Sequence, residues 1–125
     1  MGWKILFMAL AGAFGTLTRY FLGGLVQQIS FQGFPLGTLV VNILGCFLFG
    51  LIWTLAAQRL AISGEMRMII LVGFLGAFTT FSTYAFETTQ MLRDSQWLWA
   101  ALNIFAQTFL GIAAMAMGYS VGKIT

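Results

Sequence analysis

The sequence predicts an all-α integral membrane protein with four membrane-spanning helices. Three observations support this fold class: the chain has 125 residues, 60% of them are hydrophobic, and only 7% carry a charge. Soluble domains average roughly 25% charged residues, so this chain could not cover a water-exposed surface. Its length allows about four spans of ~20 residues with short connections. We therefore expect residues 1–125 to form a single transmembrane domain.

The polar residues argue against several classes of function. A net charge of +3 is too small for a nucleic-acid-binding surface. The chain has no histidine and one cysteine, Cys46, which argues against a Cys/His metal site and against a nucleophile–histidine pair. We therefore expect neither an enzyme nor a nucleic-acid partner, and we expect the protein to lie in a lipid bilayer.

The first predicted span runs from about Ile5 to Val26 and contains Arg19. A charge at the bilayer centre costs ~2.5–3.5 kcal/mol on insertion scales, so this arginine needs an explanation. Because Arg19 lies past the middle of the span, its side chain could extend to the interface as an anchor. Alternatively, it could lie at a pore mouth and attract anions. An uncharged polar loop, Gln27 to Leu36, follows this span.

The second predicted span, from about Gly37 to Ala57, places Thr38 and Asn42 on one face, because they are four residues apart. An asparagine in a membrane helix usually forms a hydrogen bond with a neighbouring helix. The alternative is that its amide N–H groups face a permeating anion. In the connector that follows, Ser63-Gly64 could cap the next helix.

The third predicted span, from about Met66 to Met91, contains the stretch GFLGAFTTFSTYAFE, which runs from Gly73 to Glu87. Its hydroxyl and ring side chains are Thr79, Thr80, Ser82 and Thr83, and Phe78, Phe81, Tyr84 and Phe86. Glycine costs roughly 1 kcal/mol against alanine inside a helix, and hydroxyls compete for backbone hydrogen bonds. Irregular backbone at membrane depth needs cover from protein or water, so we expect a helix break beside a polar pathway. The alternative is a continuous helix whose hydroxyls and glycines serve packing.

The fourth predicted span runs from about Trp97 to Val121, and a short connector at Arg93–Gln96 makes it an antiparallel neighbour of the third. A stripe of amides and small residues follows one face: Asn103, Gln107, Gly111, Ala114 and Gly118. Small residues allow helices to approach closely and amides bond across the contact, so packing alone could explain this stripe. Every span has one small or polar face, and four short helices make a thin bundle. We therefore infer at least a homodimer.

The distribution of basic residues weakly favours a cytoplasmic N-terminus. With four spans, the N-terminus, the second connector and the C-terminus share one side, which holds Lys4, Arg59, Arg67 and Lys123. The other side holds Arg93, and Arg19 if its side chain extends there. Loops rich in lysine and arginine prefer the cytoplasm. The bias is small enough that insertion in both directions is feasible.

Three stretches of the chain occur in a fixed order: GTLTRYFLG around Arg19, GTLVVN from Gly37 to Asn42, and GFLGAFTTFSTYAFE from Gly73 to Glu87. Together they resemble the Fluc family of bacterial fluoride channels, also called CrcB. The resemblance covers nearly the whole chain, because the length and the four-span layout match as well. The TTFST core within a glycine-rich third span is the most specific part.

This resemblance implies an antiparallel, dual-topology homodimer with two fluoride pores, whose third helix is broken at the midplane. It also implies a structural sodium ion at the dimer centre, held by backbone carbonyls that match those of Gly76 and Thr79. The implied function is passive export of cytoplasmic fluoride across the bacterial inner (plasma) membrane. The predicted ion pathway consists of Arg19, Thr38, Asn42, Phe81, Ser82, Thr83, Tyr84, Asn103 and Gln107.

Elementary chemistry agrees with an anion pathway. Fluoride is small and strongly hydrated, so a pore must replace its water with donors while still releasing the ion. Asn42 offers N–H groups, and Ser82 or Thr83 offers an O–H group. The positive edge of the Phe81 ring can attract an anion without binding it tightly. Tyr84 stands where the family has a second phenylalanine, so it keeps the ring edge and adds a hydroxyl.

Two other functions are alternatives to a fluoride channel. The first is a coupled small-molecule exporter of the four-span type, which needs a carboxylate in the first span for proton exchange. The acidic residues of this chain are Glu65, Glu87 and Asp94, and none of them lies in that span. The second alternative is a structural membrane subunit, which would not require the clustered hydroxyls and rings of the third span.

Overall fold

The computed structural model describes residues 2–58 and 62–124, and every regular element among them is a helix. The first two spans are α1 (Gly2–Gln27) and α2 (Leu36–Gln58). The third span consists of α3 (Gly64–Met68), the π-helical segment η1 (Ile69–Leu75), α4 (Gly76–Phe78) and α5 (Phe81–Arg93). The fourth consists of α6 (Trp97–Phe105), the π-helical segment η2 (Ala106–Leu110) and α7 (Gly111–Ile124).

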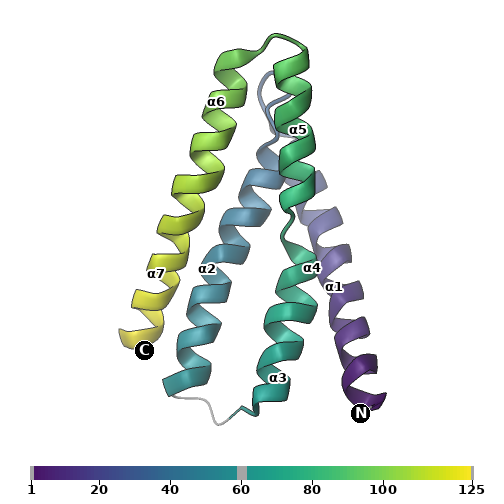
Figure 1. Cartoon of the computed structure of the whole chain (residues 1–125), viewed down its shortest axis with the longest axis vertical. Helices are drawn as coiled ribbons and strands as arrows, with labels where there is room; N and C mark the ends of the chain where they lie inside the picture. The colour runs from purple at the N-terminus through teal and green to yellow at the C-terminus, as the bar shows by residue number, and fades with distance from the viewer. Residues whose placement is uncertain (1, 59–61, 125) are drawn as a thin grey trace.

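The four spans run antiparallel to their chain neighbours (Figure 1). The start of α1, the end of α2, the start of α3 and the end of α7 lie at one end of the bundle, and the α1–α2 and α5–α6 loops lie at the opposite end. Four helical stretches in the described residues are long and apolar enough to cross a membrane, which confirms the four predicted spans. Arg59, which the charge count placed in the second connector, lies outside the described residues. Ser63 caps α3 by accepting a hydrogen bond from the Met66 N–H at 3.2 Å, as its position predicted.

Glycines bring the backbones of α2 and α7 into direct contact, and this is the most extensive helix pairing in the chain. A Cβ atom added to Gly118 would overlap the Phe47 carbonyl, and one added to Gly50 would overlap the Met115 carbonyl. Close approach of this kind is how membrane helices associate when the lipid gives no hydrophobic preference for either side. The small residues predicted on the fourth span therefore serve this packing.

A small core lies where the third span crosses α2. It is formed by Val41, Leu71, Leu75 and Phe78, all at most 4% exposed. The α1 helix packs against η1 and α4 on the other side, where Gly15 approaches the Phe74 carbonyl too closely to admit a Cβ. The third span is therefore held between α1 and α2 just before α4 ends.

The third span loses its helical geometry at Thr79 and Thr80. Thr79 has φ −86° and ψ 160°, and Thr80 has φ −150° and ψ 117°, so both are extended. The Thr79 N–H still donates to the Leu75 carbonyl at 3.0 Å. The Thr80 N–H instead donates to the Asn42 side chain, so the Gly76 carbonyl does not receive the i+4 hydrogen bond that a continuous helix would give it.

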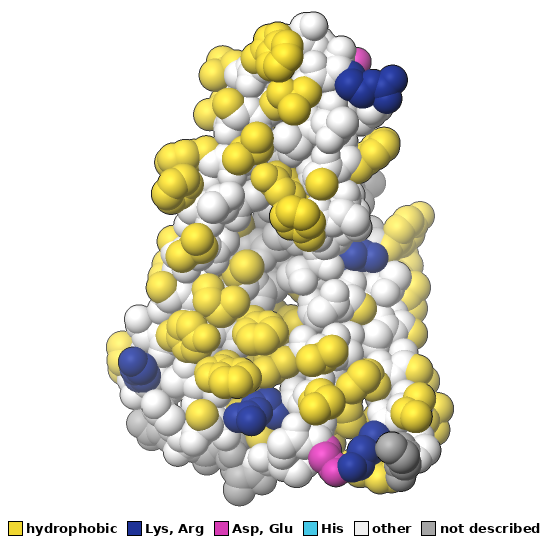
Figure 2. Space-filling view, viewed as in Figure 1, with side chains coloured by type: hydrophobic (Ala, Val, Ile, Leu, Met, Phe, Trp, Pro, Cys, Tyr) yellow, Lys and Arg dark blue, Asp and Glu magenta, His cyan; other side chains and the backbone are white. Residues whose placement is uncertain are grey.

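Apolar side chains cover much of the outer surface. Figure 2 shows one face, on which hydrophobic side chains occupy much of the middle and most lysine and arginine side chains lie toward the two ends. Large rings and aliphatic groups such as Phe14, Phe21 and Ile112 are more than 60% exposed. In water such a surface would be costly, whereas in lipid or against a second subunit it is favourable.

Candidate ion pathway

Asn42 of α2 makes three side-chain hydrogen bonds, two to the extended segment of the third span and one to the fourth span. Its Oδ1 accepts from the Thr80 N–H at 2.8 Å, and its Nδ2 donates to the Thr80 carbonyl at 3.0 Å. The same Nδ2 donates to Gln107 Oε1 at 3.0 Å. Both N–H groups of Asn42 are therefore used inside the protein, in the interhelical hydrogen bonding that its position in a membrane helix predicted.

The Thr80 hydroxyl begins the α5 helix. Its Oγ1 accepts from the Thr83 N–H at 3.1 Å, which is the usual way in which a threonine caps a helix N-terminus. The same oxygen donates to the Thr83 hydroxyl at 2.9 Å. The Thr83 hydroxyl proton remains available as a donor beside the positive end of the α5 dipole.

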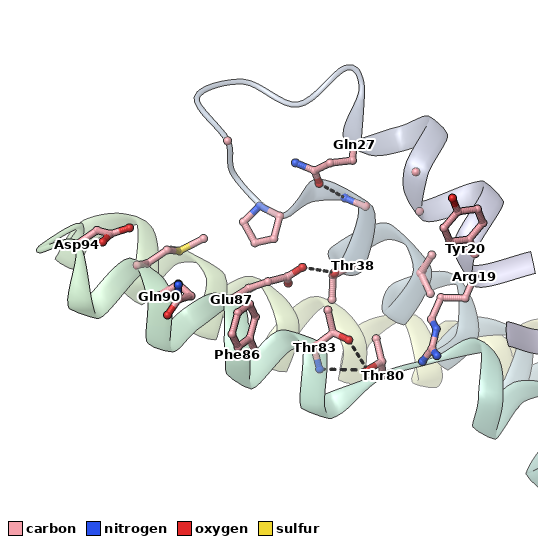
Figure 3. A pocket seen from close by; sticks show the side chains of 17 residues that line it. Arg19, Tyr20, Gln27, Thr38, Thr80, Thr83, Phe86, Glu87, Gln90 and Asp94 are labelled. Carbon is pink, nitrogen blue, oxygen red and sulfur yellow. Dashed lines mark hydrogen bonds between the residues drawn. The ribbon is translucent and has the colours of Figure 1, made fainter. Parts of the chain in front are cut away.

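A first pocket, which we call the loop-side pocket, lies between α1, α2 and α5 and has a volume of about 550 Å³. Figure 3 shows its side chains, among them Arg19, Thr38, Thr83 and Glu87. The Arg19 Nη1 atom donates to the Thr79 carbonyl at 3.3 Å. Arg19 thus reaches the extended segment and brings a positive charge into this pocket.

Glu87 projects into the loop-side pocket from α5 toward α2 (Figure 3). Its Oε1 accepts a hydrogen bond from the Thr38 hydroxyl at 2.7 Å, and its Oε2 is covered and has no hydrogen-bond partner in the described structure. The carboxylate is therefore partly buried inside the bundle, not fully solvated at a helix end.

A second pocket, which we call the mid-bundle pocket, has a volume of about 540 Å³. It is lined by Asn42, Gly45, Cys46, Phe49, Leu75, Gly76, Thr79, Thr80, Phe81, Tyr84, Gln107, Thr108, Gly111, Ile112 and Met115. Thr80 also lines the loop-side pocket, so the two pockets meet at this residue of the extended segment. The Phe81 and Tyr84 rings meet edge to face here, with their centroids 5.4 Å apart.

The structure divides the predicted site residues into three groups. Arg19, Thr38 and Thr83 line the loop-side pocket. Asn42, Gly76, Thr79, Phe81, Tyr84 and Gln107 line the mid-bundle pocket. Ser82 and Asn103 line neither pocket. Asn103 is fully buried, and its Nδ2 donates to the Thr88 hydroxyl at 2.9 Å, so it joins α6 to α5.

Thr80 is absent from the predicted ion pathway, yet the structure places it at the junction of both pockets. Its side chain caps α5 and its backbone binds Asn42. A signal was present: a threonine three residues before Thr83, directly after the glycine-rich stretch, fits the preference of helix N-caps for hydroxyl residues. A helix start within the third span would have followed from it.

Comparison with known proteins identifies the family. A family model described as CrcB-like protein, Camphor Resistance (CrcB), matches residues 6–119. A protein of Nitrosococcus oceani named fluoride-specific ion channel FluC is 57% identical over 121 residues, which cover 97% of this chain and 97% of the relative. Proteins with the same name from Desulforapulum autotrophicum and Solidesulfovibrio magneticus are 50% and 51% identical over the same share of each chain. The predicted resemblance is thus confirmed: this multi-pass membrane protein belongs to the CrcB-like family, which is a family of ion channels and not of enzymes.

Proposed function

We propose that this protein is a fluoride-selective channel that exports cytoplasmic fluoride by passive electrodiffusion across a bacterial inner membrane. The structural observation that carries the proposal is the pair of pockets that meet at Thr80, where the third span is interrupted. The name shared by the relatives, fluoride-specific ion channel, supports the choice of ion.

The two pockets offer an anion different groups. In the loop-side pocket, Arg19 supplies a positive charge and the Thr83 hydroxyl supplies a donor. In the mid-bundle pocket, Phe81 and Tyr84 supply ring edges. Several weak sites in series suit conduction, because an ion must leave each site as readily as it enters. We propose that fluoride passes from one pocket to the other beside Thr80.

We also propose that two copies associate in antiparallel orientation, with the interruption at Thr79 and Thr80 near the membrane midplane. The Phe81 side chain is 78% exposed although it lines the mid-bundle pocket, so a second subunit is needed to enclose this part of the pathway. The loops that connect the four spans contain few charged residues, which is compatible with insertion in both directions.

The backbone around the extended residues Thr79 and Thr80 suits a structural sodium site. The Gly76 carbonyl lacks its helical partner, and the Thr79 carbonyl, which accepts one hydrogen bond from Arg19, keeps a second lone pair for a cation. Carbonyls of unwound membrane helices are suitable sodium ligands. We propose that these two oxygens would hold the ion, which would supply a fixed positive charge near the pathway.

The coupled exporter is the second candidate, and Glu87 is the observation that favours it. A carboxylate that is partly buried in the loop-side pocket could carry a proton. The measurement described next separates the two candidates.

Liposomes that contain the purified protein and are loaded with potassium fluoride are expected to release fluoride only when a potassium ionophore is added. The reason is that passive anion flux builds up a voltage that stops it unless another ion compensates. A fluoride electrode measures the release, and liposomes loaded with chloride provide the comparison. Release that required a proton gradient instead would support the exporter.

A cysteine introduced as Thr125→Cys is expected to be labelled from both sides of the membrane. Antiparallel insertion places half of the C-termini on each side, so a membrane-impermeant maleimide should label one part in intact cells and the rest after permeabilisation. The parent chain, whose Cys46 lines a pocket within the bundle, gives the background. Labelling from one side only would exclude dual topology while leaving the channel assignment intact.

The variant Thr79→Ala is expected to lower fluoride flux by less than about tenfold. The substitution removes the hydrogen bond from the Thr79 hydroxyl to the Leu75 carbonyl but keeps the carbonyl proposed to bind sodium. A neutral hydrogen bond contributes about 1 kcal/mol, which is less than a factor of ten. Flux per folded dimer is the measurement. Complete loss with an intact dimer would mean that the side chain, and not the carbonyl, is essential.

A further inference from the structure

The orientation of the Gln107 amide is set by the extended backbone of the third span. A backbone N–H can only donate and a backbone carbonyl can only accept. Thr80 presents both to Asn42, so Asn42 must direct its Oδ1 to the Thr80 N–H and its Nδ2 to the Thr80 carbonyl. The amide of Asn42 therefore has one orientation.

The orientation of the Asn42 amide in turn fixes the orientation of the Gln107 amide. The second N–H of Asn42 Nδ2 points to Gln107 at 3.0 Å, and only an oxygen can accept it, so Gln107 must present its Oε1. The Gln107 Nε2 atom is consequently turned away from Asn42. It is covered by the protein and has no hydrogen-bond partner in the described structure. The chain of amides thus ends in two unused N–H donors.

The surroundings of Gln107 favour an anion as the missing partner. Gln107 lines the mid-bundle pocket, which no Asp, Glu, Lys or Arg among the described residues lines, and which receives the rings of Phe81 and Tyr84. Beside Gln107 Nε2 itself a cation would meet two N–H donors, whereas a small anion would be met by those N–H groups and by positive ring edges. The residue also lies in η2, and single π-helical turns within α-helices are frequent at functional sites.

We propose that the Gln107 Nε2 amide is an anion-binding group of the mid-bundle pocket, and that Asn42 is the residue that positions it. The proposal rests on the proposed function, since it assigns fluoride as the anion. The two amides have different roles. Asn42, oriented by the Thr80 backbone, fixes the orientation of the Gln107 amide, and Gln107 contacts the ion. A buried donor without a hydrogen-bond partner raises the free energy of the protein. An anion that binds to Gln107 Nε2 would remove this cost, which favours binding there.

The test compares Gln107→Glu and Gln107→Met in liposomes at neutral pH, over a range of fluoride concentrations. Gln107→Glu keeps an oxygen for Asn42 but replaces both donors with an acceptor, so fluoride flux should fall by about tenfold or more. Gln107→Met removes the donors without adding charge, and it frees one N–H of Asn42 to face the pocket. Its flux should fall less, with a raised half-saturating fluoride concentration.

The exposed residue Gln28 provides matched controls, because Gln28→Glu and Gln28→Met make the same chemical changes away from both pockets. These controls should conduct like the parent. Parental flux in Gln107→Glu with an intact dimer would overturn the proposal, and if that variant does not fold, parental flux and half-saturation in Gln107→Met would overturn it. Absence of fluoride flux in the parent would instead refute the proposed function itself.

Discussion

Fluoride flux through the Asn42→Asp variant is expected to fall by about a hundredfold or more. The carboxylate can still accept from the Thr80 N–H, but its other oxygen would face the Thr80 carbonyl and Gln107 Oε1, which Nδ2 now contacts at 3.0 Å each. Two hydrogen bonds thus become contacts between oxygens. A negative charge about 4 Å from an anion adds roughly 4 kcal/mol of repulsion at an effective dielectric constant near 20.

The measurement is flux per folded protein, with the content of the proposed dimer determined by size-exclusion chromatography. Gln58→Glu is the matched control, because it makes the same amide-to-carboxylate change at the exposed end of the same helix. It should leave flux unchanged. Normal conduction in Asn42→Asp would show that Asn42 serves helix packing only and that the pathway does not pass it.

Phe81→Ile is expected to reduce fluoride flux to the background of protein-free liposomes while leaving the fold intact. Isoleucine keeps apolar bulk but lacks the polarised ring edge that can face an anion. The Phe81 ring is 78% exposed in the single chain and contacts the Tyr84 ring edge to face. Exposed substitutions usually change stability by no more than about 0.5 kcal/mol, so the subunit should still fold, and size-exclusion chromatography separates a loss of assembly from a loss of conduction.

Phe21→Ile provides the matched control, because the Phe21 ring is also exposed and also meets a tyrosine, Tyr20, edge to face at 5.4 Å. That variant should conduct normally. If Phe81→Ile conducts as well as Phe21→Ile does, ring edges play no part in the pathway, and the hydroxyl and amide donors must suffice.

The spans and one helix cap were predictable from the sequence because they depend on local properties. Hydropathy over ~20 residues identifies a membrane helix without any knowledge of its neighbours. The cap at Ser63 depends on residues three positions apart. The crowding of hydroxyls and rings between Gly73 and Glu87 likewise marked the region where both pockets now meet.

The use of each polar group was not predictable, because it depends on partners far away in the sequence. Asn42 bonds to residues 38 and 65 positions later, and these bonds occupy the N–H groups that chemistry alone would have offered to an anion. Arg19 reaches a carbonyl 60 positions later. Asn103 shares a stripe with Gln107 but donates to Thr88 of α5, a partner that the stripe alone does not indicate.

The α1–α2 loop is closed by amide, hydroxyl and carbonyl groups, without a charged side chain. Gln27 donates to the Phe34 carbonyl at 2.9 Å and accepts from the Gly37 N–H at 3.0 Å, so one side chain closes the loop at both ends. At the same end of the bundle, the connection between α5 and α6 adds one basic residue, Arg93. During synthesis, a nascent chain therefore has little charge at this end to retain it on one side of the membrane. Under the proposed dual topology, a single messenger would supply both orientations of the subunit, and no second gene would be needed to encode an inverted partner.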